Sequence, residues 1–217
     1  MHRGRSDQWL GEGDVPRPAL APAAVMVSGS PASGKTTLAT ALAAVARYVL
    51  IDLDTVTGPL THAALRASGE DESAIDTHAG EQLRAARYDT LIDVAAANLE
   101  IGLGVVIAAP FTRERSSPRR FEHVVRKLRE GRPHAEVALV YIDAPADLVR
   151  QRLTARNAPR DRAKLSRAPT RKHEAPLVPG ALVLDGSQSL ADQLARVLDA
   201  LARPSGWRTN QPRADLC

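Results

Sequence analysis

Cysteine is nearly absent from this sequence: the only one is Cys217, the last residue. A single cysteine excludes an internal disulfide framework and a cysteine-based metal site, and it makes a reducing, cytoplasmic location the default expectation. Aromatic residues are also scarce, at 3%, which argues against a surface that stacks the bases of single-stranded nucleic acid. No apolar run reaches the length that spans a membrane, so we expect no membrane partner.

What is present suits one α/β domain. The chain has 217 residues, 44% of them hydrophobic, and a formal net charge of +4. That length fits a single domain with a core of ordinary size. The positive charge suits an anionic ligand, although it describes a mildly basic surface equally well. Residues 1–20 and 204–217 mix Arg, Gly, Asp and Pro without periodicity, so we expect a flexible arm and tail around a domain at 21–203.

Short apolar segments alternate with helical patterns along this domain. The apolar segments are residues 23–28, 48–53, 104–109, 137–143 and 181–184. Their continuous apolar character is typical of parallel strands covered on both faces. Strands that alternate with helices imply right-handed βαβ units, so we predict a three-layer α/β/α sandwich around a five-stranded parallel sheet.

Helices are predicted between these strands, at 36–46, 118–130 and 189–202. In the second of them Ser117 is a good N-cap, Pro118 suits the first helical position, and Gly131 marks the end. The long span 55–103 must hold two or more helices. In a fold of this kind an insertion there usually covers the substrate.

A glycine-rich loop carries the strongest functional signal. It follows the first predicted strand, precedes a helix, and reads Gly29-Ser30-Pro31-Ala32-Ser33-Gly34-Lys35-Thr36, which matches the phosphate-binding pattern G-x-x-x-x-G-K-[ST]. The glycines let the backbone turn its N–H groups toward phosphate oxygens, and the helix start adds a positive dipole. Lys35 can then reach the β- and γ-phosphates, and the Thr36 hydroxyl can bind Mg²⁺.

Two carboxylates follow the second predicted strand, at Asp52 and Asp54. Residues i and i+2 of a strand share a face, so both could point into one cleft at the edge of the sheet where ligands bind. A carboxylate there can take the proton of an acceptor hydroxyl. Asp52 could instead orient Lys35, a water or the metal. The alternative for Asp54 is that it only caps the next helix.

Basic residues dominate the segment 150–172, where the only acid is Asp161. Arg152, Arg156 and Arg160 recur every four residues, so on a helix they would form one stripe. Guanidinium groups on a closing lid can stabilise the charge of a phosphoryl-transfer transition state. The alternative is a solvated basic face.

Together these segments resemble the P-loop small-molecule kinases, a group with the chloramphenicol phosphotransferases, the zeta-type toxin kinases and the kinase-like proteins called AAA family ATPases. The resemblance covers roughly residues 23–202. It rests on four segments, GSPASGKT at 29–36, IDLDT at 51–55, APFTRER at 109–115 and YIDAPADLVRQRLTARNAPRD at 141–161.

The resemblance implies a P-loop NTPase fold with a helical lid at about 150–172 and acceptor-covering helices at 55–103. It also implies transfer of the γ-phosphate of ATP, with Mg²⁺, to a hydroxyl of a small molecule such as an antibiotic, a sugar or a nucleoside-type metabolite. The catalytic residues it implies are Asp54 as the base, Lys35, Arg152 and Arg156. The nucleotide-binding residues are Gly29, Ser30, Pro31, Ala32, Ser33, Gly34, Lys35, Thr36, Thr37, Arg152 and Arg160. The acceptor-binding residues are Asp54, Thr112 and Arg113, and those assigned to the metal are Thr36 and Asp52.

One departure from the P-loop ATPases separates the candidate functions. The third predicted strand ends Ile107-Ala108-Ala109-Pro110, without the acid that a mechanical ATPase carries there. This counts against a nucleotide-switched regulatory ATPase, the first alternative. The second is a kinase of nucleic-acid ends, against which the few aromatics and moderate charge argue. We expect a monomer or a homodimer, and no role is assigned to His62, His78, Arg84 or His173.

Overall fold

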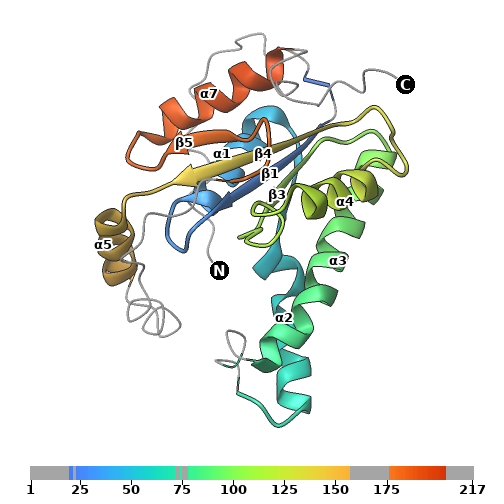
Figure 1. Ribbon diagram of the computed structural model, residues 1–217, viewed down its shortest axis with the longest axis vertical. Helices are drawn as coiled ribbons and strands as arrows, with labels where there is room; N and C mark the ends of the chain where they lie inside the picture. The colour runs from blue at the N-terminus through green and yellow to red at the C-terminus, as the bar shows by residue number, and fades with distance from the viewer. Residues whose placement is uncertain (1–19, 22, 72–73, 75–77, 157–175, 204–217) are drawn as a thin grey trace, which may run out of the picture.

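The computed structural model describes residues 20–21, 23–71, 74, 78–156 and 176–203, and its centre is a five-stranded parallel sheet (Figure 1). The strands are β1 (Ala23–Gly29), β2 (Val49–Asp52), β3 (Val105–Ala108), β4 (Glu136–Asp143) and β5 (Leu182–Asp185). Their order across the sheet is β2-β3-β1-β4-β5. The predicted α/β fold with five parallel strands is confirmed.

The strand register brings the ends of β1 and β2 to one edge of the sheet. Asp52 of β2 pairs with Ala108 of β3, which pairs with Val27 of β1. At the usual spacing of roughly 4.8 Å between strands, β2 lies about 10 Å from β1. The loop after β1 and the helix after β2 therefore start at the same edge, separated by the width of β3.

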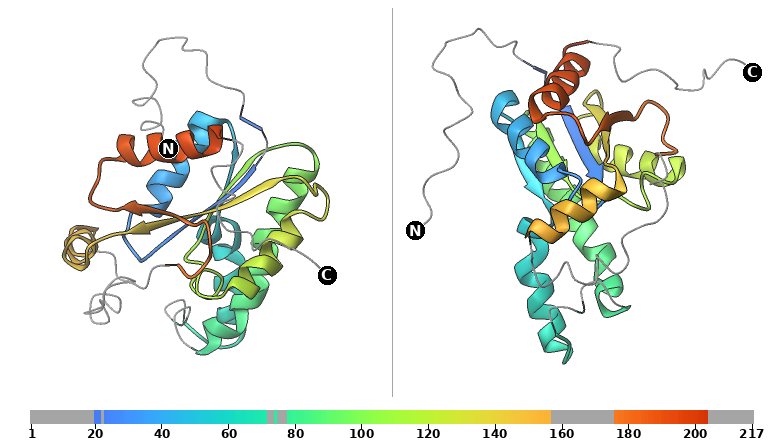
Figure 2. Two further views of the ribbon diagram at one scale, coloured as in Figure 1. Left: turned by 45° about the horizontal axis from the view of Figure 1, so that its top comes forward. Right: turned by 90° about the vertical axis from the view of Figure 1, so that its left-hand side faces the viewer.

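Helices cover both faces of the sheet (Figure 2). They are α1 (Lys35–Ala46), α2 (Leu53–Ala67), α3 (His78–Glu100), α4 (Pro118–Leu128), α5 (Ala146–Arg156) and α7 (Leu190–Ala202). On one face, Leu38 and Leu42 of α1 and Val197 of α7 pack on Val25 and Val27 of β1. α2 packs on α3, and this pair extends beyond the sheet (Figure 1).

The other face carries a second core under α3 and α4. Leu91 and Leu99 of α3 and Leu128 of α4 cluster there with Ala24 and Met26 of β1. Alternate residues of one strand thus serve two separate hydrophobic clusters, as the pleat of a β-strand requires. β1 and β3 are buried along their whole length, whereas the edge strands are not: Leu50 of β2 and Val183 of β5 are exposed. The sequence predicted that every strand would be covered on both faces. The structure confirms this only for the strands at the centre of the sheet.

Most predicted boundaries hold to within one or two residues. Ser117 caps α4 through its side chain, as predicted, but the helix ends at Leu128 with Arg129 as C-cap, ahead of Gly131. The span 55–103 lies in α2 and α3, which confirms two helices there. The structure describes only the first part of the predicted lid, in α5, and residues 157–172 lie outside the described residues. The predicted tail and all of the predicted arm except Leu20 also lie outside them. No helix in the described part of the chain is long and apolar enough to cross a membrane.

We predict that Leu99→Ala lowers the free energy of unfolding by about 2–5 kcal/mol, because the residue is fully buried between α3 and the sheet and its truncation leaves a cavity. Val94→Ala on the same helix is the control. Val94 is 37% exposed, so its loss should change stability by less than about 0.5 kcal/mol. Urea titrations of both variants measure the difference, and similar shifts would contradict the described packing of α3.

Candidate nucleotide and acceptor site

The loop from Gly29 to Gly34 turns tightly between β1 and α1. Ala32 and Gly34 have positive φ angles of 59° and 104°, and the Ser33 amide donates to the Ser30 carbonyl at 3.2 Å. Left-handed residues in such a turn gather successive N–H groups into an anion-binding concavity. Glycine is required at position 29, where a Cβ would lie 2.4 Å from Ser33 Oγ and 3.1 Å from the Ile142 carbonyl oxygen.

The polar atoms around this loop fit a nucleotide phosphate. Within the described structure, the buried hydroxyls of Ser30 and Ser33 have no hydrogen-bond partner. Lys35 Nζ lies 3.3 Å from the Ser30 carbonyl oxygen. Gly34, the N-cap of α1, has no side chain to occupy the first N–H groups of that helix, which leaves them for an anion. Thr36 and Thr37 are exposed in its first turn, and Pro31 is exposed in the loop.

A hollow of about 380 Å³ runs along the loop toward α7. It brings most of the predicted nucleotide-binding residues together with Arg152 of α5, and Gln188 and Leu190 also line it. Sequence reasoning did not find the latter two, because no local pattern marks them.

Arg152 holds the glycine-rich loop from the side. Its guanidinium donates to the carbonyl oxygens of Ala32 at 3.4 Å and Ser33 at 3.0 Å, and to that of Gly186 at 3.2 Å. The Gly186 turn is itself shaped by Asp185, which accepts hydrogen bonds from Ser187 N and Oγ, and these bonds lower the pKa of that carboxyl. Arg152 therefore joins the phosphate loop to the segment after β5. Arg156 ends α5, but its side chain lies outside the described residues, as does all of Arg160.

The two predicted carboxylates belong to different elements, which corrects the geometry expected from a shared strand face. β2 ends at Asp52, and Asp52 is the N-cap of α2: its Oδ1 accepts from the amides of Asp54 and Thr55 at 3.1 and 3.0 Å and from Thr55 Oγ1. The capping residue is thus Asp52 and not Asp54. Asp54 lies in the first turn of α2, exposed, where Arg87 of α3 donates to its Oδ1 at 3.0 Å.

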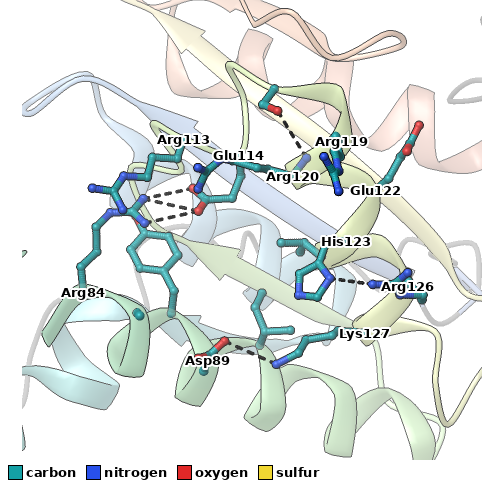
Figure 3. A pocket seen from close by; sticks show the side chains of 15 residues that line it. Arg84, Asp89, Arg113, Glu114, Arg119, Arg120, Glu122, His123, Arg126 and Lys127 are labelled. Carbon is teal, nitrogen blue, oxygen red and sulfur yellow. Dashed lines mark hydrogen bonds and ion pairs between the residues drawn. The ribbon is translucent and has the colours of Figure 1, made fainter. Parts of the chain in front are cut away.

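The predicted acceptor residues lie on the loop after β3. Thr112 is exposed, and its carbonyl accepts from Ser116 Oγ. Arg113 is ion-paired with Glu81 of α3. Neither residue lines the hollow beside the phosphate loop, and Arg113 lines a second hollow of about 900 Å³ between α3 and α4 (Figure 3).

A buried polar cluster ties this loop to α3, and sequence reasoning missed it. Arg84 pairs with Glu114 at 3.2 Å, with both side chains largely buried, as Figure 3 shows. The Arg84 guanidinium also lies 4.1 Å from the centre of the Tyr88 ring. Tyr88 accepts a hydrogen bond from the Phe111 amide, and burial raises the pKa of Tyr88 to about 12. The partners lie 30 and 23 residues apart in the chain, so no local pattern marks the cluster.

A sequence profile of the AAA domain family matches residues 25–176. The chain belongs to this family. Among curated proteins, none matches this AAA domain protein in sequence.

Several solved structures share this fold, and three of these are described as kinases. A putative kinase from Chloroflexus aurantiacus is 22% identical to this AAA domain protein, with a TM-score of 0.62 over 84% of this chain and 97% of that one. A sugar kinase from Janibacter sp. is 24% identical, with a TM-score of 0.57 over 82% and 93%. The APS kinase of Mycobacterium tuberculosis, solved with AMPPNP and APS, is 19% identical, with a TM-score of 0.57 over 85% and 99%. The predicted P-loop kinase resemblance is confirmed at the level of family and fold.

We predict that Arg152→Ala raises the Kd for ATP at least about tenfold, or about 1.4 kcal/mol, because two contacts to carbonyls of the phosphate loop and one to the Gly186 carbonyl are lost. Arg150→Ala is the control, since Arg150 is exposed on the same helix. Isothermal titration calorimetry with ATP measures both. An unchanged Kd accompanied by a fall in turnover would instead make Arg152 a transition-state residue.

Proposed function

We propose that this protein transfers the γ-phosphate of Mg-ATP to a hydroxyl of a small molecule. The observation that carries the proposal is the placement of the Asp54 carboxylate and the phosphate loop at one edge of the sheet, two strand positions apart. β2 lies about 10 Å from β1 at the usual strand spacing, and we infer that this spacing leaves room for an acceptor between the γ-phosphate and the base. A carboxylate aimed at an acceptor serves phosphoryl transfer better than it serves hydrolysis that only switches a conformation.

The similar structures support a small acceptor. They include a sugar kinase, an APS kinase and, in Sinorhizobium meliloti, a gluconokinase. For this chain we propose the same class of substrate, a soluble compound that carries a hydroxyl. An antibiotic, a sugar and a nucleoside-type metabolite all remain in that class.

In the proposed reaction the acceptor oxygen forms a bond to the γ-phosphorus while the bond to the β,γ-bridging oxygen breaks and ADP leaves. The hydroxyl proton passes to Asp54. Lys35 and the N–H groups of the loop stabilise the phosphate oxygens, and the proposed arginines Arg156 and Arg160 add charge from the lid. Thr112 and Arg113 are the proposed contacts to the acceptor.

Mg²⁺ bound with ATP would neutralise charge on the phosphate oxygens. The hydroxyl of Thr36, exposed at the start of α1, suits that ion. Asp52 uses Oδ1 for its cap, so we propose that its second oxygen orients a water of the metal. Arg152, whose guanidinium faces backbone carbonyls, is proposed to position the nucleotide loop.

The test of the function is a screen for ADP release that depends on an added acceptor. Sugars, sugar acids, nucleosides and hydroxylated antibiotics are offered singly with Mg-ATP, and Lys35→Ala serves as the inactive control. We expect at least one compound to raise ADP release and to appear phosphorylated by mass spectrometry. Phosphate released to water at one rate, whatever the compound, would support a regulatory ATPase instead.

We predict that Asp54→Asn lowers transfer by roughly 10²–10⁴-fold, the usual contribution of a general base, and leaves the Kd for ATP unchanged. Asp52→Asn is the matched comparison, because asparagine also caps a helix and so preserves the start of α2. It should cause a milder loss, seen mainly as a higher Mg²⁺ requirement. A larger loss for Asp52→Asn would reverse the roles of the two carboxylates.

A further inference from the structure

Two hydrogen bonds from Arg87 of α3 connect that helix to the N-terminal part of α2, and a third bond within α2 anchors one of their acceptors. Thr57 Oγ1 lies 2.6 Å from the Leu53 carbonyl oxygen, Arg87 Nε lies 3.0 Å from Thr57 Oγ1, and Arg87 Nη2 lies 3.0 Å from Asp54 Oδ1. These contacts form a continuous chain from the backbone of α2 through Arg87 to the carboxylate.

The directions of these bonds are fixed by chemistry. A threonine hydroxyl has one proton, and a carbonyl oxygen can only accept, so Thr57 donates to Leu53. Its oxygen then accepts from Arg87, which can only donate. The Nε–H group of Arg87 is therefore held by the buried Thr57 hydroxyl. This hydrogen bond orients the guanidinium that contacts Asp54.

Burial changes sharply along the chain of contacts. Thr57 is 4% exposed, the Arg87 side chain is 13% exposed, and the Asp54 side chain is 66% exposed. The arginine is thus part of the protein interior and the carboxylate faces solvent. An exposed aspartate on a helix normally samples several rotamers, and contact with a fixed guanidinium reduces that freedom.

Only one carboxylate oxygen is engaged. Arg87 contacts Oδ1, and no contact of Oδ2 with another described residue is seen. We propose that Arg87, anchored by Thr57, is a positioning residue that holds Asp54 with Oδ2 free to take the acceptor proton. This inference rests on the proposed function, because it assigns a role to the base of that reaction.

The same contact links the proposed base to α3, the helix expected to cover the acceptor. α3 also contacts the loop after β3, through Glu81 to Arg113 and through Arg84 to Glu114. An acceptor that binds against that loop therefore meets a base whose orientation is set by the same helix. The competing explanation is a plain α2–α3 ion pair, which at a partly exposed site contributes little to stability and nothing to turnover.

Thr57→Val separates these explanations, because it removes the acceptor for Arg87 Nε and leaves both charged residues in place. Thr61→Val is the matched control: Thr61 is equally buried on the same helix and donates to the Thr57 carbonyl, but it has no arginine in its described contacts. Thr57→Ser retains the hydroxyl and tests rescue. Each variant is also made in the Asp54→Asn background, and an Arg87→Met variant joins both sets.

The measurement is the turnover of Mg-ATP, with water as the acceptor and with any acceptor that the screen provides, together with the KM for ATP and the Tm. We expect Thr57→Val to lower turnover roughly tenfold, within the range that small misplacements of a reacting group cause, and Arg87→Met to lower it at least as much. KM for ATP should stay within about twofold. Thr61→Val should retain turnover even where its Tm falls as far, and Thr57→Ser should recover most of the loss.

The outcomes decide both proposals separately. In the Asp54→Asn background, neither Thr57→Val nor Arg87→Met should lower turnover further, since the group they position is gone. Equal losses for Thr57→Val and Thr61→Val, or a further loss from Arg87→Met in that background, would overturn the positioning role. If Asp54→Asn alone retains turnover with every acceptor, the proposed base is wrong and the positioning role falls with it.

Discussion

A glycine-rich phosphate loop holds a polyphosphate mainly by turning backbone N–H groups toward one point. In this chain the need to orient these N–H groups explains the tight turn from Gly29 to Gly34. Several neighbouring segments hold the turn in place. The Ile142 carbonyl lies close behind Gly29, Arg152 holds two loop carbonyls, and α1 continues directly from Gly34. A central position for β1 follows, because only a central strand has neighbours on both sides whose following segments can reach the loop.

The parts of this arrangement that sequence could predict are those set by contiguous residues. The glycine-rich pattern includes both residues with positive φ, Ala32 and Gly34, and predicts the helix that follows. Ser117 before Pro118 specifies the start of α4 by a local hydrogen bond. The contacts of Arg84 and Arg87 could not be predicted in this way, since their partners lie 30 and 33 residues away. The sequence of α3 has no single apolar stripe that would predict its packing face, because the helix contacts α2, α4 and the sheet.

The second carboxylate shows why local rules misplace side chains at element boundaries. A strand that continued through Leu53 would put both acids on one face. Instead Asp52 accepts the first amides of α2 and thereby ends the strand. The helix then continues through Gly58 and Pro59, residues that disfavour a helix interior. In this part of α2 the hydroxyls of Thr57 and Thr61 donate hydrogen bonds to backbone carbonyls, and the helix packs on α3.

The two faces of the sheet hold separate hydrophobic clusters, one under α1 and α7 and one under α3 and α4. Helix α1, which follows the phosphate loop, packs in the first cluster, and Ala32 of that loop packs with Val149 and Leu153 of α5 in a small third one. The helices around the carboxylate and the loop after β3 pack in the second. With the acceptor bound beside α3, as proposed, substitutions in the cluster under α3 and α4 would change the choice of acceptor and leave the packing under α1 and α7 unaltered. The sheet separates the two clusters, because their side chains lie on its opposite faces. The amino-acid sequence on one face can therefore change while that on the other face is retained.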